Sequence, residues 1–229
     1  MSPIAANLQA IRRRISEALQ GDSREVQLVA VSKGQPPEAL REAFAAGVRD
    51  FGESYVQEAL PKIEQFAGLA AIWHFIGHVQ TNKAREIARA FDWVHAVDRA
   101  KAAAALSKAR EGAARPLQVC IQVNISGETS KGGVSEAEAP GLAREVASLP
   151  GLRLRGLMGM ASFTDDVAAQ RSQFASLARA RRAVLAAGIE LDTLSMGMSH
   201  DFEAALAEGA TMVRIGTAIF GERTHRKAA

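Results

Sequence analysis

The chain has 229 residues, of which 48% are hydrophobic and 23% are charged, ordinary values for a globular protein. Lys and Arg number 28 against 25 Asp and Glu, and the excess lies in short runs at 11–15, 178–182 and 221–229, so nucleic-acid binding is not expected as the main role. The single cysteine excludes a disulfide framework within the chain, and no apolar run approaches the ~20 residues of a membrane helix.

The first predicted element is an amphipathic helix over residues 3–20. This segment lacks the apolar core of a signal peptide, and we therefore expect a cytoplasmic protein. Short runs of β-branched and apolar residues follow, and each is predicted as a strand: 26–33, 48–53, 72–78, 93–98, 117–124, 152–160, 191–198 and 212–221. Alanine-rich helical segments separate these runs, and strands that alternate with helices pair in parallel.

Eight strand–helix units in one chain of this length fit a single-domain (β/α)₈ barrel, the α/β TIM barrel, with an extra N-terminal helix. Periodicity alone does not exclude an open doubly wound sheet. No low-complexity linker divides the chain, so the sequence predicts one domain over residues 1–229.

Polar residues end most of the predicted strands. In such barrels the active site forms at the C-terminal strand ends. The residues found there are Lys33, Glu53, His78, Asp98, Asn124, Met160, Ser199 and Arg214. Any strand must re-enter solvent somewhere, so one such residue means little, whereas the set indicates a polar mouth above a packed barrel.

Lys33 follows the apolar stretch 28–31 and precedes Gly34. A lone lysine at a strand end is usually solvated surface. A reactive lysine instead needs partial desolvation or a nearby cation, which lowers the pKa of the amine. The opposite end of the chain favours the second interpretation.

An anion site is predicted after strands seven and eight, where barrels frequently bind phosphate. The segment 194–206 runs into a helix expected to begin near Ser199, a residue type suited to the N-cap. Gly216 and Thr217, placed on strand eight, offer backbone amides to the same anion. Asp201, in the first turn of that helix, would compete for its positive end.

A reactive amine that faces a phosphate cradle suits pyridoxal 5′-phosphate (PLP), which carries an aldehyde and a phosphate on different sides of its ring. Arg214 is the candidate for the ring nitrogen, because a permanently charged guanidinium would keep that nitrogen unprotonated. An unprotonated ring is a poorer electron sink, which suits modest carbanion chemistry or storage.

Seven segments, in order and spread over nearly the whole chain, resemble the pyridoxal phosphate homeostasis proteins, single-domain barrels similar to the N-terminal domain of alanine racemase. They are "AVSKGQP" (30–36), "FGESYVQEAL" (51–60), "WHFIGHVQTNK" (73–83), "VNISGETSKGG" (123–133), "RGLMGM" (155–160), "LSMGMSHDFEAAL" (194–206) and "VRIGTAIFGER" (213–223). The family is regarded as non-catalytic and acts in intracellular vitamin B6 homeostasis.

The resemblance implies a role for each candidate residue. Lys33 would hold PLP as an internal aldimine, and Arg214 would face the ring nitrogen. Ser199, with backbone amides around Gly216 and Thr217, would bind the phosphate. The family usually has asparagine where this chain has Ser54, which leaves open any contact through that side chain.

Two enzymatic alternatives stay open. The first is a PLP-dependent amino-acid racemase or decarboxylase of the same barrel type. A two-base racemase needs a second proton donor, which the resembling enzymes take from a tyrosine in an added β-domain, whereas this chain has only Tyr55, and Cys120 sits inside a strand. The second is a barrel enzyme for phosphorylated metabolites in which Lys33 pairs with a carboxylate.

The remaining expectations concern metals and partners. His74 and His78 share a strand face, but no third ligand accompanies them, so no metal is expected. PLP is the expected partner; transient contact with PLP-dependent acceptor enzymes is one route for its delivery, and the recipient stays open. A monomer is the default, because no long apolar surface stripe is left over.

Overall fold

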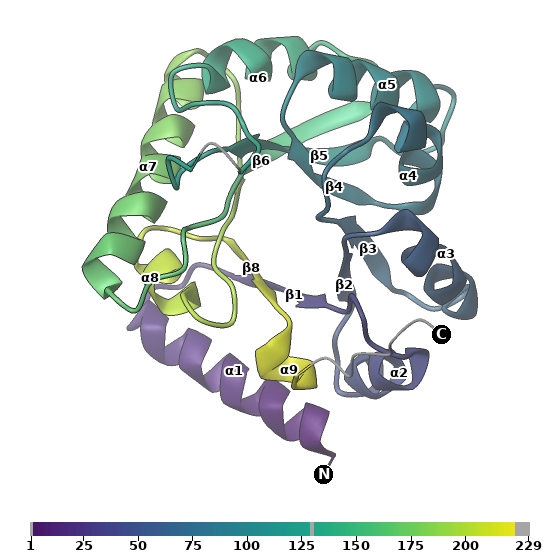
Figure 1. Ribbon diagram of the computed structural model, residues 1–229, viewed down its shortest axis with the longest axis vertical. Coiled ribbons are helices and arrows are strands. Elements are labelled where there is room, and N and C mark those ends of the chain that lie inside the picture. Colours follow the sequence, from purple (N-terminus) through teal and green to yellow (C-terminus); the bar gives the residue numbers. More distant parts are fainter. Residues whose placement is uncertain (1, 129–130, 223–229) are drawn as a thin grey trace.

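The computed structural model describes residues 2–128 and 131–222, so the ends of the predicted domain, including the basic tail from residue 223, lie outside the described residues. Within them, eight parallel strands close into a barrel in the order β1 to β8 (Figure 1). The strands are β1 Gln27–Val31, β2 Asp50–Glu53, β3 Ile72–Phe75, β4 Trp93–Val97, β5 Leu117–Val123, β6 Leu152–Gly159, β7 Thr193–Ser195 and β8 Met212–Ile215. The predicted TIM barrel is confirmed, and the open sheet is excluded.

Helices surround the barrel (Figure 1). They are α1 Pro3–Leu19, α2 Pro37–Ala45, α3 Val56–Gln65, the 3₁₀ turn η1 Thr81–Lys83, α4 Ala84–Ala90, α5 Ala100–Arg110, α6 Ala139–Ala147, α7 Val167–Ala186, α8 Phe202–Ala207 and α9 Thr217–Phe220. None of these described helices is both long enough and apolar enough to cross a membrane.

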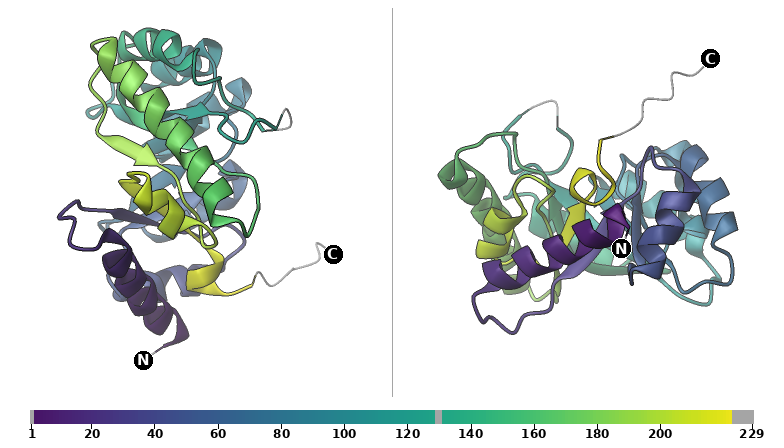
Figure 2. Two further views of the ribbon diagram at one scale, coloured as in Figure 1. Left: turned by 90° about the vertical axis from the view of Figure 1, so that its left-hand side faces the viewer. Right: turned by 90° about the horizontal axis from the view of Figure 1, so that it is seen from below.

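The extra N-terminal helix α1 lies on the outside of the barrel beside α8 and α9 (Figure 2). It begins at Pro3 because the Ser2 hydroxyl accepts a hydrogen bond from the amide of Ala5, and proline suits the first helical position. Its buried stripe comprises Ile4, Leu8, Ile11 and Ile15. The Asn7 side-chain amide donates to the carbonyl of Ile219 at 2.9 Å, so α1 ties the start of the chain to its last helix.

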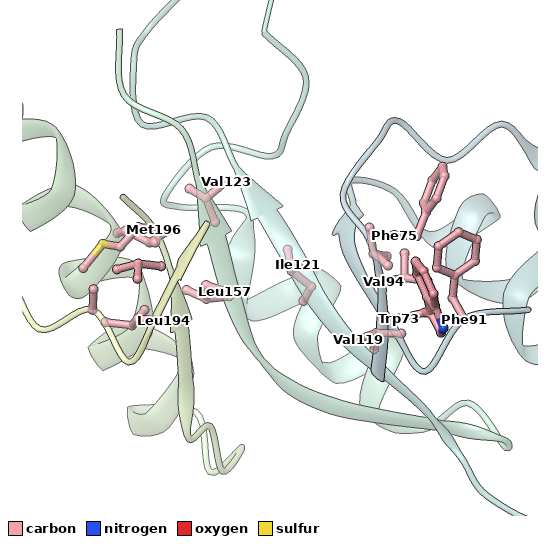
Figure 3. Packing of buried hydrophobic residues seen from close by; sticks show 14 of the residues in the cluster. Trp73, Phe75, Phe91, Val94, Val119, Ile121, Val123, Leu157, Leu194 and Met196 are labelled. Atoms are coloured by element: carbon pink, nitrogen blue, oxygen red, sulfur yellow. The ribbon is translucent and has the colours of Figure 1, made fainter. Parts of the chain in front are cut away.

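The main apolar core lies between the strands and the helices. Figure 3 shows two parts of it: Trp73, Phe75, Phe91 and Val94 near β3 and β4, and Leu157 on β6 with Leu194 on β7 and Met196 directly after it. Alternate residues of the same strands point into the barrel. A smaller cluster gathers there: Val29, Trp93, Ala96, Cys120, Met158 and Met212. Polar side chains share this interior, which bears on the site.

Candidate functional site

A cavity of about 250 Å³ opens at the C-terminal ends of the strands. Its lining residues are Val31, Lys33, Ser54, Ile76, Met160, Met198, Ser199, His200, Arg214, Gly216 and Thr217. The five residues predicted as a binding site, Lys33, Ser199, Arg214, Gly216 and Thr217, all belong to this set. The structure therefore brings the two distant ends of the sequence to one place.

Lys33 lies in a tight turn directly after β1, rather than on the strand itself. The amide of Gln35 donates to the carbonyl of Ser32 at 3.0 Å, which closes a four-residue turn. Gly34 occupies the third position with φ 73°, a left-handed conformation that favours glycine. The "SKG" sequence thus turns the chain sharply after the strand and presents the lysine at the cavity.

A buried cluster of charged groups holds this turn from the side facing α3. The Lys62 ammonium donates to the carbonyl of Ser32 at 2.8 Å, to a carboxylate oxygen of Glu53 at 2.8 Å and to one of Glu58 at 2.7 Å. The Ser32 hydroxyl donates to the same Glu53 oxygen at 2.7 Å, and the amide of Gly34 donates to Glu58. We call these four residues, Ser32, Glu53, Glu58 and Lys62, the Lys62 cluster.

Burial dominates the electrostatics of this cluster. Glu53 is fully buried, and the loss of water raises the pKa of its carboxyl, although the nearby Lys62 ammonium opposes that rise. Its second oxygen, Oε2, is buried and has no hydrogen-bond partner within the described part of the chain. The sequence placed Glu53 at the polar mouth, and this prediction is wrong: Glu53 points out of the barrel toward α3 and supports the turn of Lys33 from behind.

Ser199 contacts the backbone at the start of α9. Its hydroxyl oxygen accepts from the amides of Gly216 and Ala218, each at 3.3 Å. Gly216 and Thr217 were placed on strand eight, but β8 ends at Ile215; Gly216 precedes α9 and Thr217 is its first residue. The amides of Gly216 and Ala218 nevertheless converge on the Ser199 hydroxyl, so the segments after β7 and β8 meet at this point.

The helix expected to begin near Ser199 begins three residues later, at Phe202. Gly197 has φ 93°, and a Cβ atom there would meet the Cβ of Ala205 at 2.7 Å, so the chain turns sharply and closely at this point. The amide of Met198 then donates to the Asp201 carboxylate at 2.6 Å. Because this turn comes first, Ser199 lies outside α8, and its hydroxyl contacts the backbone that follows β8 instead.

Arg214 projects from β8 into the barrel and is 4% exposed. Its guanidinium donates to the Ser195 hydroxyl at 2.7 Å and to the carbonyl of Gly159 at 3.0 Å. Burial lowers the pKa of Arg214 to about 10, against the opposing charge of Asp201, so the group remains a cation at neutral pH. A guanidinium has five N–H donors, so it can serve the cavity as well as these two acceptors.

The two histidines considered as metal ligands separate in the structure. His74 is fully buried inside the barrel, and its ring nitrogens contact Asp50 and His95, each at 2.9 Å. His78 lies beyond the end of β3, exposed, with Nδ1 3.4 Å from Asp98. Among residues 2–128 and 131–222, no group of three His, Cys, Asp or Glu could hold a metal ion.

Sequence reasoning missed several residues around the cavity. No role was predicted for Lys62 or Glu58, and His95 was predicted only as part of the strand 93–98. Cys120 is buried in the barrel interior as expected, and burial raises the pKa of its thiol to about 12. Ser54 lines the cavity, so the position that departs from the family pattern lies at the site itself.

Comparisons with known proteins agree with this architecture. The family model "Alanine racemase, N-terminal domain" matches residues 3–224. The pyridoxal phosphate homeostasis protein of Pseudomonas aeruginosa is 54% identical over 228 residues, 98% of each chain. Its counterpart in Escherichia coli K12 is 47% identical over 233 residues, 99% of this chain and 100% of its own. A structure of PipY from Synechococcus elongatus with PLP bound is 36% identical, with a TM-score of 0.84, and covers 95% of this chain and 100% of PipY.

Proposed function

This chain belongs to the family of the pyridoxal phosphate homeostasis proteins, and we propose that it binds PLP in the cavity beside Lys33 and holds it in reserve without turning over a substrate. The observation that carries the proposal is the convergence of an amine, a guanidinium and an anion cradle on one cavity. The PLP-bound structure of PipY, which shares the fold at a TM-score of 0.84, supports the identity of the ligand.

The residues present fit the three functional groups of PLP. Lys33 offers an amine for the aldehyde, and Arg214 offers N–H donors for the ring nitrogen. Ser199, with the amides around Gly216 and Thr217, offers hydrogen bonds to a phosphate. The cavity volume of about 250 Å³ lies just below the ~300 Å³ at which small-molecule pockets usually begin.

We propose that Lys33 bonds the aldehyde covalently as a Schiff base. The neutral amine adds to the aldehyde carbon, the nitrogen gives up its two protons, and the carbonyl oxygen leaves with them as water. The Lys62 cluster supports this role because it fixes the backbone on both sides of Lys33. Bound PLP supplies a reactive carbonyl equivalent, and the chain's own residues hold it and cover it.

The racemase or decarboxylase alternative is not favoured. Tyr55 is 65% exposed and lines a neighbouring hollow, outside the described lining of the Lys33 cavity. Cys120 is buried with a pKa raised to about 12, which makes it a poor proton donor. Loss of one positioned acid or base lowers the rate of catalysis by about 10²–10⁴-fold.

The cytoplasmic location, the monomeric state and contact with acceptor enzymes stay predictions.

Borohydride reduction tests the proposal. The purified protein is mixed with PLP, reduced, digested and analysed by peptide mass. We expect one reduced pyridoxyl group, carried by the peptide that contains Lys33, and no modification in Lys33→Ala. Lys83→Ala, at the neighbouring hollow, is the matched control and should be modified like the parent protein.

Two results would overturn the proposal. An unmodified Lys33 after reduction would favour the phosphorylated-metabolite enzyme, in which this lysine pairs with a carboxylate. Robust racemisation or decarboxylation of an amino acid by the PLP-loaded protein would favour the enzymatic alternative. Both assays use the same preparation, so the three functions are distinguished directly.

A further inference from the structure

A continuous line of buried hydrogen bonds crosses the barrel interior and ends at Arg214. The Arg214 guanidinium lies 2.7 Å from the Ser195 hydroxyl, which lies 2.9 Å from Nδ1 of His95. Nε2 of His95 lies 2.9 Å from Nδ1 of His74, and Nε2 of His74 lies 2.9 Å from the Asp50 carboxylate. We call Ser195, His95, His74 and Asp50 the histidine chain.

When both imidazoles are neutral, the two ends of this line set the direction of every hydrogen bond in it. Arginine can only donate, so the Ser195 oxygen accepts from it. An ionised Asp50 can only accept, so Nε2 of His74 carries a hydrogen, and the Nδ1 of a neutral His74 accepts one from His95. His95 then receives the hydroxyl hydrogen of Ser195 at its Nδ1. Every donor therefore points away from the arginine and toward the carboxylate.

Burial makes this arrangement self-consistent. His74, His95 and Ser195 are each fully buried. Desolvation, with the nearby cation of Arg214, lowers the pKa of His95 well below its ordinary value, so the His95 ring is neutral as the chain requires. Linked hydrogen bonds in a low-dielectric interior polarise one another, so a carboxylate at one end makes the Ser195 oxygen a better acceptor at the other.

A packed barrel does not by itself call for such a line. Barrel interiors of this type are dominated by bulky branched aliphatic residues. This chain instead lines up polar side chains from β2, β3, β4 and β7 toward one guanidinium, and three of them, His74, His95 and Ser195, are fully buried. The arginine at its end lines the cavity with Lys33.

We propose that the residues of the histidine chain are positioning residues that hold and polarise Arg214 for its contact with the ring nitrogen of bound PLP. The inference rests on the proposed function. Ser195 acts directly on the guanidinium, whereas Asp50, at the N-terminal end of β2, acts through the line of imidazoles. The ring nitrogen thus responds to a carboxylate on the opposite end of the barrel.

The test measures the ¹⁵N resonance of PLP labelled at the ring nitrogen and bound to the full chain. In Ser195→Ala we expect the resonance to move toward that of a pyridine nitrogen without a donor, and the PLP dissociation constant to rise about ten-fold, as for the loss of one charge-assisted hydrogen bond. Asp50→Asn keeps an acceptor oxygen for His74 but removes the charge, so the resonance should move in the same direction by less.

Ser107→Ala is the matched control. Ser107 is 5% exposed, and its hydroxyl donates to the carbonyl of Pro150 at 2.6 Å from α5, outside the barrel. This variant loses one buried hydroxyl and should leave the resonance unchanged. If Ser195→Ala does not fold, Asp50→Asn tests the role of the histidine chain on its own, because the Asp50 side chain is partly exposed.

The outcomes separate the two proposals. Suppose that borohydride reduction labels Lys33 but the ring-nitrogen resonance in both Ser195→Ala and Asp50→Asn equals that of the parent protein. The proposed role of the histidine chain is then overturned, and the proposed function stays intact. Absence of labelling in the parent protein overturns the proposed function before the chain is in question. If the resonance moves as far in Ser107→Ala as in Ser195→Ala, the loss of any buried hydroxyl produces the shift, and the inference is also overturned.

Discussion

The Lys62 cluster and the histidine chain lie on opposite faces of the same barrel wall and bury polar groups in different ways. The Lys62 cluster packs charged groups between the outer face of β1 and β2 and the helix α3. The histidine chain places two imidazoles inside the barrel, between the Arg214 guanidinium at one end and the Asp50 carboxylate at the other. The first holds the backbone of Lys33, and the second holds the side chain of Arg214.

This difference teaches how each is expected to respond to pH. Burial disfavours the charged form of a titratable group, which is the anion of a carboxyl and the cation of an imidazole. The pKa of Glu53 is raised by burial and that of His95 is lowered by burial. The two regions should therefore lose stability in opposite directions of pH.

The largest expected effect comes from Lys62→Met. Lys62 is 5% exposed, and its removal leaves the fully buried Glu53 without its cation. Breaking a buried pair in this way costs about 3–5 kcal/mol of unfolding free energy. Urea denaturation at neutral pH measures it. Lys83→Met is the control, because the Lys83–Glu86 pair is far more exposed and should cost less than about 1 kcal/mol. Equal costs for the two variants would contradict the description of the Lys62 cluster.

The next effect is the acid sensitivity conferred by His95. Below the ordinary imidazole pKa of 6.5, the unfolded chain takes up a proton that the folded chain refuses. The free energy of unfolding should therefore fall as pH decreases below that value, by up to about 1.4 kcal/mol per pH unit. His95→Gln should flatten this slope, and the exposed His78→Gln should not. Denaturation curves between about pH 5 and pH 7 measure how the free energy of unfolding changes with pH. A slope in His95→Gln equal to that of the parent protein would refute the prediction.

Glu53 should give a smaller effect of the opposite sign. Its carboxyl binds a proton more tightly in the folded chain than at the ordinary pKa of 4.5, although Lys62 opposes this. The contribution of Glu53 is therefore complete below pH 4.5 and is lost as pH rises through the raised pKa of the folded state. Glu53→Gln should gain stability relative to the parent as pH rises. Parallel stability curves for the parent and Glu53→Gln would show the expected sign to be wrong.

The smallest effect sharpens the comparison with a matched pair of serines. Ser32 and Ser195 are both fully buried, and each hydroxyl serves one of the two regions. Ser32→Ala should cost about 1–2 kcal/mol and slow the labelling of Lys33 by PLP without moving the ring-nitrogen resonance. Ser195→Ala should move the ring-nitrogen resonance and leave the rate of Lys33 labelling at saturating PLP unchanged. Stopped-flow absorbance and ¹⁵N spectra separate the two, and a shared response would mean that the regions are not independent.

The sequence predicts the barrel well because its evidence is local and repeated. Alternation of apolar strands with alanine-rich helices occurs eight times, so errors at single boundaries do not change the topology. Lys33 and Arg214 were found because each is a charged residue in an otherwise apolar run. Such a signal is visible in the local sequence, without knowledge of which residues lie close together in the fold.

The residues that were missed depend on contacts between distant segments. Lys62 sits in a helix that also carries Glu58 and Glu64, and only packing against β1 and β2 buries it. His95 contacts a residue 21 positions away and another 100 positions away, and no local pattern records such pairs. The start of α8 was misplaced for a related reason, since the close turn at Gly197 overrides the helical tendency that follows.

The cavity straddles the seam at which the first strand meets the last. Residues 27–30 of β1 pair with residues 212–215 of β8, and Lys33 and Gly216, which follow these two strands, both line the cavity. A growing polypeptide on the ribosome presents β1 and Lys33 first, and the residues around Gly216 join them only after β8 has emerged and the ring has closed. Under the proposed function, binding of PLP would therefore require a completed barrel.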